Sequence, residues 1–171
     1  MNHILTTRLN LFPCDIGIIE AIQEGNAHFA HKIGANVPGN WTEYGIEPII
    51  FVKNKLIKHP EEALWWGWMG VHRAEKSLVV NGGFKGAPSG EGIVEIGYEV
   101  APTYRNLGVA TEFVNALIEL AFSDKQVKKI TAHTLAEENA SVRVLKKCGF
   151  EFIQSLHDPE DGEIWQWAKN R

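Results

Sequence analysis

The segment YRNLGVATEF, residues 104–113, combines residue types that suit a negatively charged ligand. It follows the apolar run IVEIGYEV and leads into a segment with helical spacing, so it lies where a strand passes into a helix. The first N–H groups of a helix lack partners within the helix, and the helix dipole adds partial positive charge there. Gly108 opens the backbone to a ligand, Ala110 adds little bulk, and Arg105 supplies a permanent charge. The segment predicts a phosphate or pyrophosphate cradle, and a plain tight turn is the alternative.

The sequence lacks the patterns of four other familiar features. The cradle lacks the Gly-Lys-Ser/Thr ending of a P-loop and the three glycines of a dinucleotide-binding fingerprint. The histidines show no ligand-like pairing with acids, and Cys14 and Cys148 lie far apart in the chain. We therefore predict no metal site and no disulfide framework.

Hydrophobic periodicity predicts a mixed order of strands and helices around the cradle, without an internal repeat. The clearest helix is residues 108–122, where apolar side chains recur at helical spacing. Pro60 is expected to end or interrupt an earlier helix, and Pro13 and Asp15 are helix-start signals. The expected strands are 4–12, 64–73, 76–84, 93–100, 127–135, 150–156 and 163–169, and the expected helices are 13–34, 46–63, 108–122 and 139–149.

Length and charge narrow the class of protein. A chain of 171 residues is expected to form a single domain, 1–171, with a sizeable core. The net charge of −4, with no Lys/Arg run, argues against a nucleic-acid partner. No signal peptide or membrane span is evident, so we expect no membrane partner and a soluble, cytoplasmic protein.

Two long segments carry a resemblance to a known family. EIGYEVAPTYRNLGVATEFVNALIELAF and AHTLAEENASVRVLKKCGF resemble the coenzyme-A-binding core of the GNAT acetyltransferase superfamily. RLNLFP, WWGWMGVHR, GGFKGAPSGEG and DPEDGEIWQW are similar to its ribosomal-protein N-terminal acetyltransferase (Rim-type) branch, so the resemblance covers almost the whole chain. Arg105, Gly108 and Ala110 meet the phosphate-loop pattern of the superfamily.

The resemblance implies a fold and a reaction. The fold is a single-domain α/β (α+β in some schemes) GNAT-like fold with a mixed, splayed central sheet flanked by helices. The reaction moves the acetyl group of acetyl-CoA directly to a primary amine of a small molecule, peptide or protein N-terminus. A non-catalytic acyl-CoA-binding or sensing module on the same fold is the alternative.

The resemblance also assigns coenzyme contacts. Tyr98, Glu99 and Val100 would lie beside the thioester, and a backbone N–H of this stretch would stabilise the developing oxyanion. Arg105 would sit at the rim of the pyrophosphate site and Asn106 would add a donor, while His133 to Leu135 would line the other side of the split in the sheet. The pyrophosphate would bind the amides of Leu107, Gly108, Val109, Ala110 and Thr111, and Asn139 and Ser141 would face the coenzyme.

Catalytic groups are implied less directly. An amine substrate must lose a proton before it attacks, and Glu95 is the first candidate for the base, with Glu99 in reserve; solvated strand carboxylates are the alternative. Ser141 is a candidate donor to the leaving thiolate, or simply a helix-start residue. Many family members have a tyrosine acid where this chain has Leu145, and that departure keeps the non-catalytic alternative open.

The acceptor site is expected in the least regular regions of the chain. Trp41, in a turn-rich loop, Trp66 and Phe84 are candidates to line it, although clustered aromatic residues are more often core. An exposed final strand or a tryptophan-rich surface would allow two copies to pair as a homodimer.

Overall fold

Helices and strands begin and end where the local sequence favours it, in a computed structural model that describes residues 3–171. Asp15 caps the first helix, because its side chain accepts a hydrogen bond from the N–H of Ile18. The third helix ends at Lys58, two residues before Pro60. In chain order the elements are β1 (Ile4–Leu5), β2 (Leu9–Pro13), α1 (Ile16–Gln23), α2 (Asn26–Ile33), α3 (Glu47–Lys58), a 3₁₀ turn (Pro60–Trp65), β3 (Gly67–His72), β4 (Ser77–Phe84), β5 (Ile93–Val100), a second 3₁₀ turn (Pro102–Tyr104), α4 (Val109–Ser123), β6 (Lys129–Leu135), α5 (Ala140–Lys147), β7 (Glu151–Asp158) and β8 (Gly162–Asn170).

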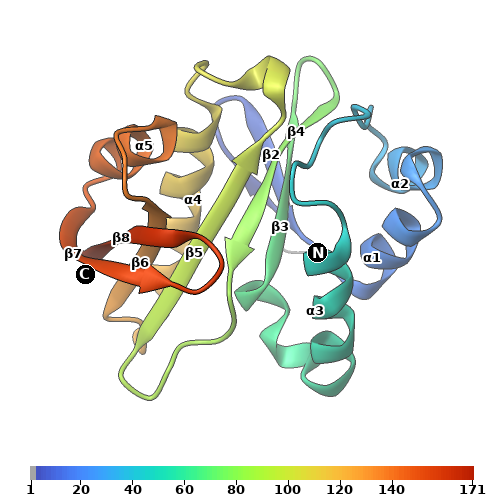
Figure 1. The fold of residues 1–171 in the computed structure, drawn as a ribbon. Helices are drawn as coiled ribbons and strands as arrows, with labels where there is room; N and C mark the ends of the chain where they lie inside the picture. Colours follow the sequence, from blue (N-terminus) through green and yellow to red (C-terminus); the bar gives the residue numbers. More distant parts are fainter. Residues whose placement is uncertain (1–2) are drawn as a thin grey trace.

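The strands within residues 3–171 form one mixed sheet in the order β1-β2-β3-β4-β5-β6-β8-β7. Neighbouring strands are antiparallel except β5 and β6, which are parallel and are connected through α4. Helices α1, α2 and α3 lie on one side of the sheet, and α4 lies on the other (Figure 1). This arrangement confirms the predicted fold class.

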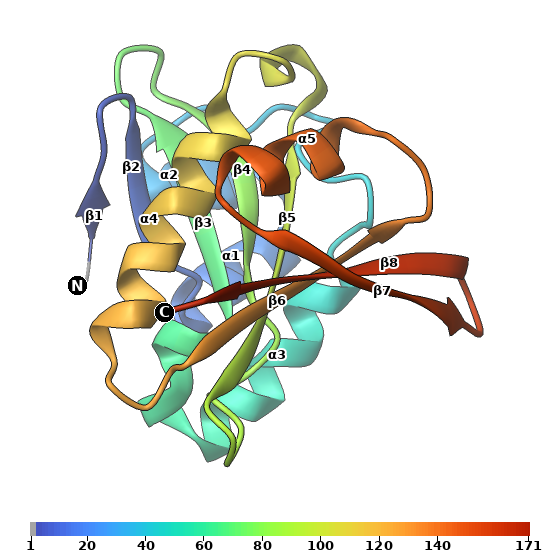
Figure 2. The same cartoon turned by 90° about the vertical axis from the view of Figure 1, so that its left-hand side faces the viewer.

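The sheet is split between β5 and β6. The two strands pair only from Ile93 to Glu95 and from Lys129 to Thr131, although both continue beyond these residues. Figure 2 shows β6, β8 and β7 running away from β5 at a steep angle. The second halves of β5 and β6 therefore face a gap in the hydrogen-bonded ladder, and α5 begins nearby.

Two hydrophobic cores cover the two faces of the sheet. Alternation along β3 sends Trp68 into a core with α4, α5 and β8, and the next residue, Met69, into a core with α1, α2 and α3. Trp68 and Met69 are both essentially inaccessible to solvent. Packing on both faces fixes the central strands that carry the site.

Two of the sequence expectations about elements were wrong. The strand expected at 4–12 is a hairpin, because the N–H of Thr6 donates to Leu9 O and the N–H of Leu9 donates to the Thr6 hydroxyl, which closes a turn. The helix expected at 13–34 is divided at Gly25, whose φ of 107° is incompatible with a helix.

No helix within residues 3–171 is long and apolar enough to cross a membrane.

Candidate active site

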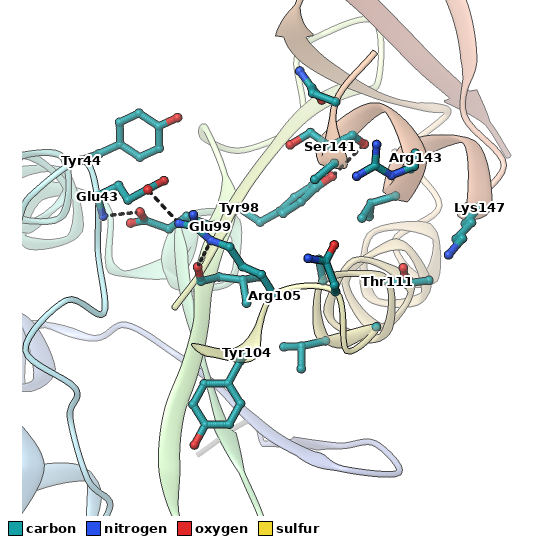
Figure 3. A pocket seen from close by; sticks show the side chains of 18 residues that line it. Glu43, Tyr44, Tyr98, Glu99, Tyr104, Arg105, Thr111, Ser141, Arg143 and Lys147 are labelled. Carbon is teal, nitrogen blue, oxygen red and sulfur yellow. Dashed lines mark hydrogen bonds and ion pairs between the residues drawn. The ribbon is translucent and has the colours of Figure 1, made fainter. Parts of the chain in front are cut away.

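A cavity of about 480 Å³ opens at the start of α4 (Figure 3). Its walls come from the end of β5, the loop 104–108, the first turn of α4 and the first turns of α5. Most of the predicted coenzyme residues line it, whereas Leu107 does not and is 56% exposed. The cavity is named the coenzyme cavity after that prediction, and the predicted residues that line it are Tyr98, Glu99, Val100, Arg105, Asn106, Gly108, Val109, Ala110, Thr111, Asn139 and Ser141.

The backbone at the start of α4 presents free amides to this cavity. Gly108 is the N-cap residue and adopts a left-handed conformation with φ of 78°. No side chain caps the helix, so the N–H groups of Val109, Ala110 and Thr111 keep their hydrogen-bonding capacity for a ligand. The positive end of the dipole of a fifteen-residue helix points the same way. An anion is the chemically matched occupant.

Basic side chains surround these amides. Arg105 donates from Nε to Val100 O at 3.1 Å and pairs through Nη2 with Glu43 Oε1 at 2.8 Å. Arg143 and Lys147, one turn apart on α5, line the same cavity (Figure 3). The sequence patterns did not single out these two α5 residues, because their helix reaches the cradle only through the fold.

Glu112, which was also not predicted as a site residue, connects the start of α4 to the turn between β1 and β2. The Glu112 carboxylate, in the first turns of α4, accepts from Thr6 Oγ1 at 2.6 Å, from Arg8 N at 2.7 Å and from Arg8 Nε at 2.7 Å. Arg8 Nη1 also donates to Leu107 O at 2.7 Å. The turn between β1 and β2 thus holds both the helix start and the loop before it.

The same contacts predict a pH-dependent contribution to stability. Burial raises the pKa of Glu112, but hydrogen bonds from Thr6 and Arg8 outweigh it and hold that pKa below its ordinary value of 4.5. The stabilisation is therefore complete above about pH 5 and is lost as pH falls through the folded-state pKa. We expect the free energy of unfolding, measured in urea, to decrease less between about pH 5 and pH 3 in Glu112→Gln than in the unchanged protein. Glu119→Gln, an exposed position on the same helix, should leave the fall intact, and equal slopes in both variants would contradict this account.

A larger cavity of about 950 Å³ lies across the split strands. It is lined by the second halves of β5 and β6, by the loop after Glu43 and by the β7–β8 turn. The two cavities meet, since both are lined by Tyr44, Tyr98, Glu99, Asn139 and Ser141. The two cavities are therefore adjacent at the split in the sheet.

Glu95 lies in the larger cavity with two basic neighbours. Its Oε1 pairs with Lys85 Nζ and lies 3.0 Å from His133 Nδ1. Burial raises the pKa of Glu95, but the bonds from Lys85 and His133 outweigh it and lower the pKa below its ordinary value. The side chain is therefore a stable carboxylate at neutral pH.

Glu99 is engaged with a loop. Its carboxylate accepts from Thr42 Oγ1 at 2.6 Å. It also accepts from Glu43 N at 2.7 Å (Figure 3). Because Glu43 also pairs with Arg105, the segment 42–43 is tied both to β5 and to the cradle. The structure thus gives Glu99 a loop-holding contact, which leaves Glu95 as the better-placed carboxylate in the larger cavity.

The junction of the cavities holds hydroxyl groups. The Tyr98 side chain points toward the start of α5, where its hydroxyl donates to Ser141 O at 3.4 Å (Figure 3). Burial raises the pKa of Tyr98, so the phenol stays protonated at neutral pH. Asn139 caps α5, because its side chain accepts from the N–H of Val142 at 3.0 Å. Leu145 is buried against the larger cavity and offers no proton.

The three aromatic residues expected to line the acceptor site lie elsewhere. Trp41 is 3% exposed, packs against Phe29, and donates from Nε1 to Asn26 Oδ1. Phe84 is buried in the core beneath α4, and Trp66 donates from its indole to Glu62. None of the three lines either cavity, because packing against apolar neighbours or the Glu62 contact takes their rings away.

The larger cavity instead carries charged groups that sequence reasoning passed over or left without a catalytic role. Lys85 and His133 contact Glu95, and the turn HDPED brings His157, Asp158 and Asp161 into the lining of the same cavity. The acidic turn HDPED is itself the sequence signal for this part of the cavity. Within residues 3–171, no group of three or more His, Cys, Asp or Glu side chains is placed to hold a metal ion.

The chain is similar in sequence and in fold to known acetyltransferases. Residues 29–151 match the model of a family described as "Acetyltransferase (GNAT) domain". The uncharacterised N-acetyltransferase YjdG of Bacillus subtilis (strain 168) is 28% identical over 146 residues, 85% of this chain and 87% of that protein. Spermidine N(1)-acetyltransferase of Vibrio cholerae serotype O1 is 22% identical over 143 residues, 77% of each chain. The fold is also that of RimL, a ribosomal alpha-N-protein acetyltransferase solved with coenzyme A, with a TM-score of 0.71, 14% identity, and coverage of 99% of this chain and 98% of that one.

Proposed function

The chain belongs to the GNAT acetyltransferase family and is an acetyl-CoA-dependent acyltransferase, and on that premise we propose that it acetylates a cationic primary amine bound in the larger cavity. Acetyl-CoA would occupy the coenzyme cavity with its pyrophosphate at the start of α4. The acetyl group would pass directly to the amine, without a covalent enzyme intermediate.

One observation carries the proposal, namely the meeting of the two cavities at the split between β5 and β6. Free amides and the basic residues Arg105, Arg143 and Lys147 suit phosphate groups on one side. On the other side the four carboxylates outnumber the single lysine ammonium group, Lys85, and this excess of negative charge suits the ammonium group of a substrate. The four carboxylates are those of Glu95, Glu99, Asp158 and Asp161. Reacting groups bound on the two sides would therefore be held together at the junction.

The residues at the junction can serve the chemistry in distinct ways. Removal of the amine proton would take place beside the carboxylate of Glu95. The hydroxyls of Tyr98 and Ser141 can donate to the leaving sulfur, in the role that Leu145 cannot fill. Backbone amides of β5 beyond its paired segment can face the thioester oxygen.

The acceptor class includes small and large amines. The spermidine and ribosomal-protein enzymes among the similar proteins act on a polyamine and on protein N-termini, respectively, by their names. A cavity of about 950 Å³ has room for either kind of chain end. The outer strand β7 exposes Phe152 and Ile153, and a homodimer through such a surface stays a prediction.

The test measures binding and turnover separately. Calorimetric titration gives the Kd of acetyl-CoA, and thiol release is followed with spermidine, simple primary amines and peptides with free N-termini. N-acetylated peptides of the same sequence are the matched control. We expect amine-dependent thiol release and an acetylated product of the expected mass.

The outcomes separate the two functional hypotheses. Turnover with free amines but not with blocked ones supports the transferase. Tight acetyl-CoA binding with no turnover on any amine would instead support the non-catalytic module. No acetyl-CoA binding would overturn the assignment of the coenzyme cavity.

A further inference from the structure

Lys85, Glu95 and His133 form a connected cluster where the sheet begins to split. Glu95 is the last residue of β5 that pairs with β6, opposite Thr131, and His133 lies two residues further along β6. Both side chains line the larger cavity and are about one quarter exposed, 27% for Glu95 and 24% for His133. They are thus sheltered from bulk solvent but reachable by a molecule in the cavity.

The contacts of Glu95 make its carboxylate a weak proton acceptor. Lys85 Nζ and His133 Nδ1 both approach the same oxygen, Oε1. These contacts favour the ionised carboxylate, which is why its pKa lies below the ordinary value despite burial. A base with a lowered pKa takes a proton from an ammonium group inefficiently.

His133 has the complementary arrangement. With its Nδ1–H donating to Glu95 Oε1 at 3.0 Å, the ring is held in one tautomer and Nε2 carries the lone pair. No hydrogen bond to Nε2 is present among the described residues. The neighbouring Gln166 on β8 is uncharged and bonds to Gln154. The other titratable groups that line this cavity are Tyr44, Lys85, Tyr98, Glu99, His157, Asp158 and Asp161.

We propose that His133 Nε2 is the proton acceptor for the amine substrate and that Glu95 is the positioning residue that fixes its tautomer, an inference that rests on the proposed function. The ammonium group gives one proton to Nε2, which leaves a neutral amine and an imidazolium ion. The amine nitrogen then bonds to the acetyl carbon as the carbon–sulfur bond breaks. The second nitrogen proton goes to the departing thiolate, and the imidazolium later returns its proton to solvent.

The test compares three substitutions in the complete chain. His133→Gln should lower kcat/KM for the amine about a hundredfold near neutral pH, the usual scale for a lost base. Glu95→Gln should cost about tenfold or less, because the amide oxygen can still accept from Nδ1–H. His28→Gln, at an exposed histidine of α2 that lines neither cavity, is the control and should change kcat/KM less than threefold.

Two further measurements distinguish a catalytic role of His133 from a purely structural one. The smaller variant His133→Ala should recover activity when imidazole is added, and its Kd for acetyl-CoA should match that of the wild-type protein. In His133→Gln, the acid limb of the pH profile of kcat/KM should disappear. A purely structural role for His133 would give neither result.

Opposite results overturn the inference in recognisable ways. If Glu95→Gln loses far more activity than His133→Gln, Glu95 is itself the base. If the wild-type protein turns over amines and neither variant is impaired, this inference fails while the proposed function stands. A wild-type protein without amine-dependent thiol release overturns the proposed function together with this inference.

Discussion

Replacing Gly108 by aspartate is expected to weaken acetyl-CoA binding about a hundredfold. Gly108 has φ of 78°, lines the coenzyme cavity and precedes the free amides of α4, so a carboxylate there would add negative charge close to the expected pyrophosphate. It would also compete for Arg8, whose Nη2 lies 3.4 Å from the position of an added Cβ. Aspartate tolerates the left-handed conformation better than most residues, which limits the strain. Repulsion of about 3 kcal/mol corresponds to roughly a hundredfold in Kd. Calorimetric titration at low and high salt measures the loss, which should shrink as salt rises.

Two matched variants separate charge from backbone strain. Gly108→Asn has nearly the same size without the charge and is expected to weaken binding only about tenfold. Gly34 also has a positive φ, 62°, with open space around it at the end of α2. Gly34→Asn should therefore cost stability without changing the Kd. If Gly108→Asp and Gly108→Asn bind acetyl-CoA equally, phosphate binding does not involve the helix start.

The strands and helices were largely predictable because they depend on local signals. The helical spacing in 108–122 and the prolines and capping residues fixed most boundaries, including Asp15 at the start of α1 and Pro60 after α3. The errors fell where a local contact overrides hydrophobic alternation. Thr6 closes a turn inside an apparently continuous strand, and Gly25 breaks an apparently continuous helix.

The gathering of Arg105, Gly108 and Ala110 around one cavity was predictable for the same reason, since these residues are neighbours in sequence. The lining of the larger cavity was not, because its residues are assembled by the sheet. Lys85 and His133 reach Glu95 from other segments only once β5 pairs with both β4 and β6. Trp41 suggested a pocket by its position in a loop, yet burial of its large ring against Phe29 contributes more to stability than exposure would.

The contact of Arg8 with the cradle leads to the second large expected effect. Arg8→Met should weaken acetyl-CoA binding roughly tenfold and lower the unfolding free energy by about 2 kcal/mol, the scale of lost charged hydrogen bonds. The Arg8 guanidinium lies beside Gly108 and neutralises Glu112, whose side chain is only 16% exposed. Without Arg8, the Glu112 carboxylate would lose its counter-charge close to the expected phosphate site. Leu107 O would also lose its hydrogen-bond donor. Titration of acetyl-CoA and urea unfolding measure the two effects.

A double-mutant cycle identifies the electrostatic part of this loss. If the repulsion comes from Glu112, then Arg8→Met combined with Glu112→Gln should bind acetyl-CoA more tightly than Arg8→Met alone, recovering most of the lost affinity. The combined variant should not regain stability to the same degree, because the bond to Leu107 O is still missing. Additive losses in affinity would show instead that Arg8 acts only by holding the loop, and the coupling between charge and coenzyme binding would have to be abandoned.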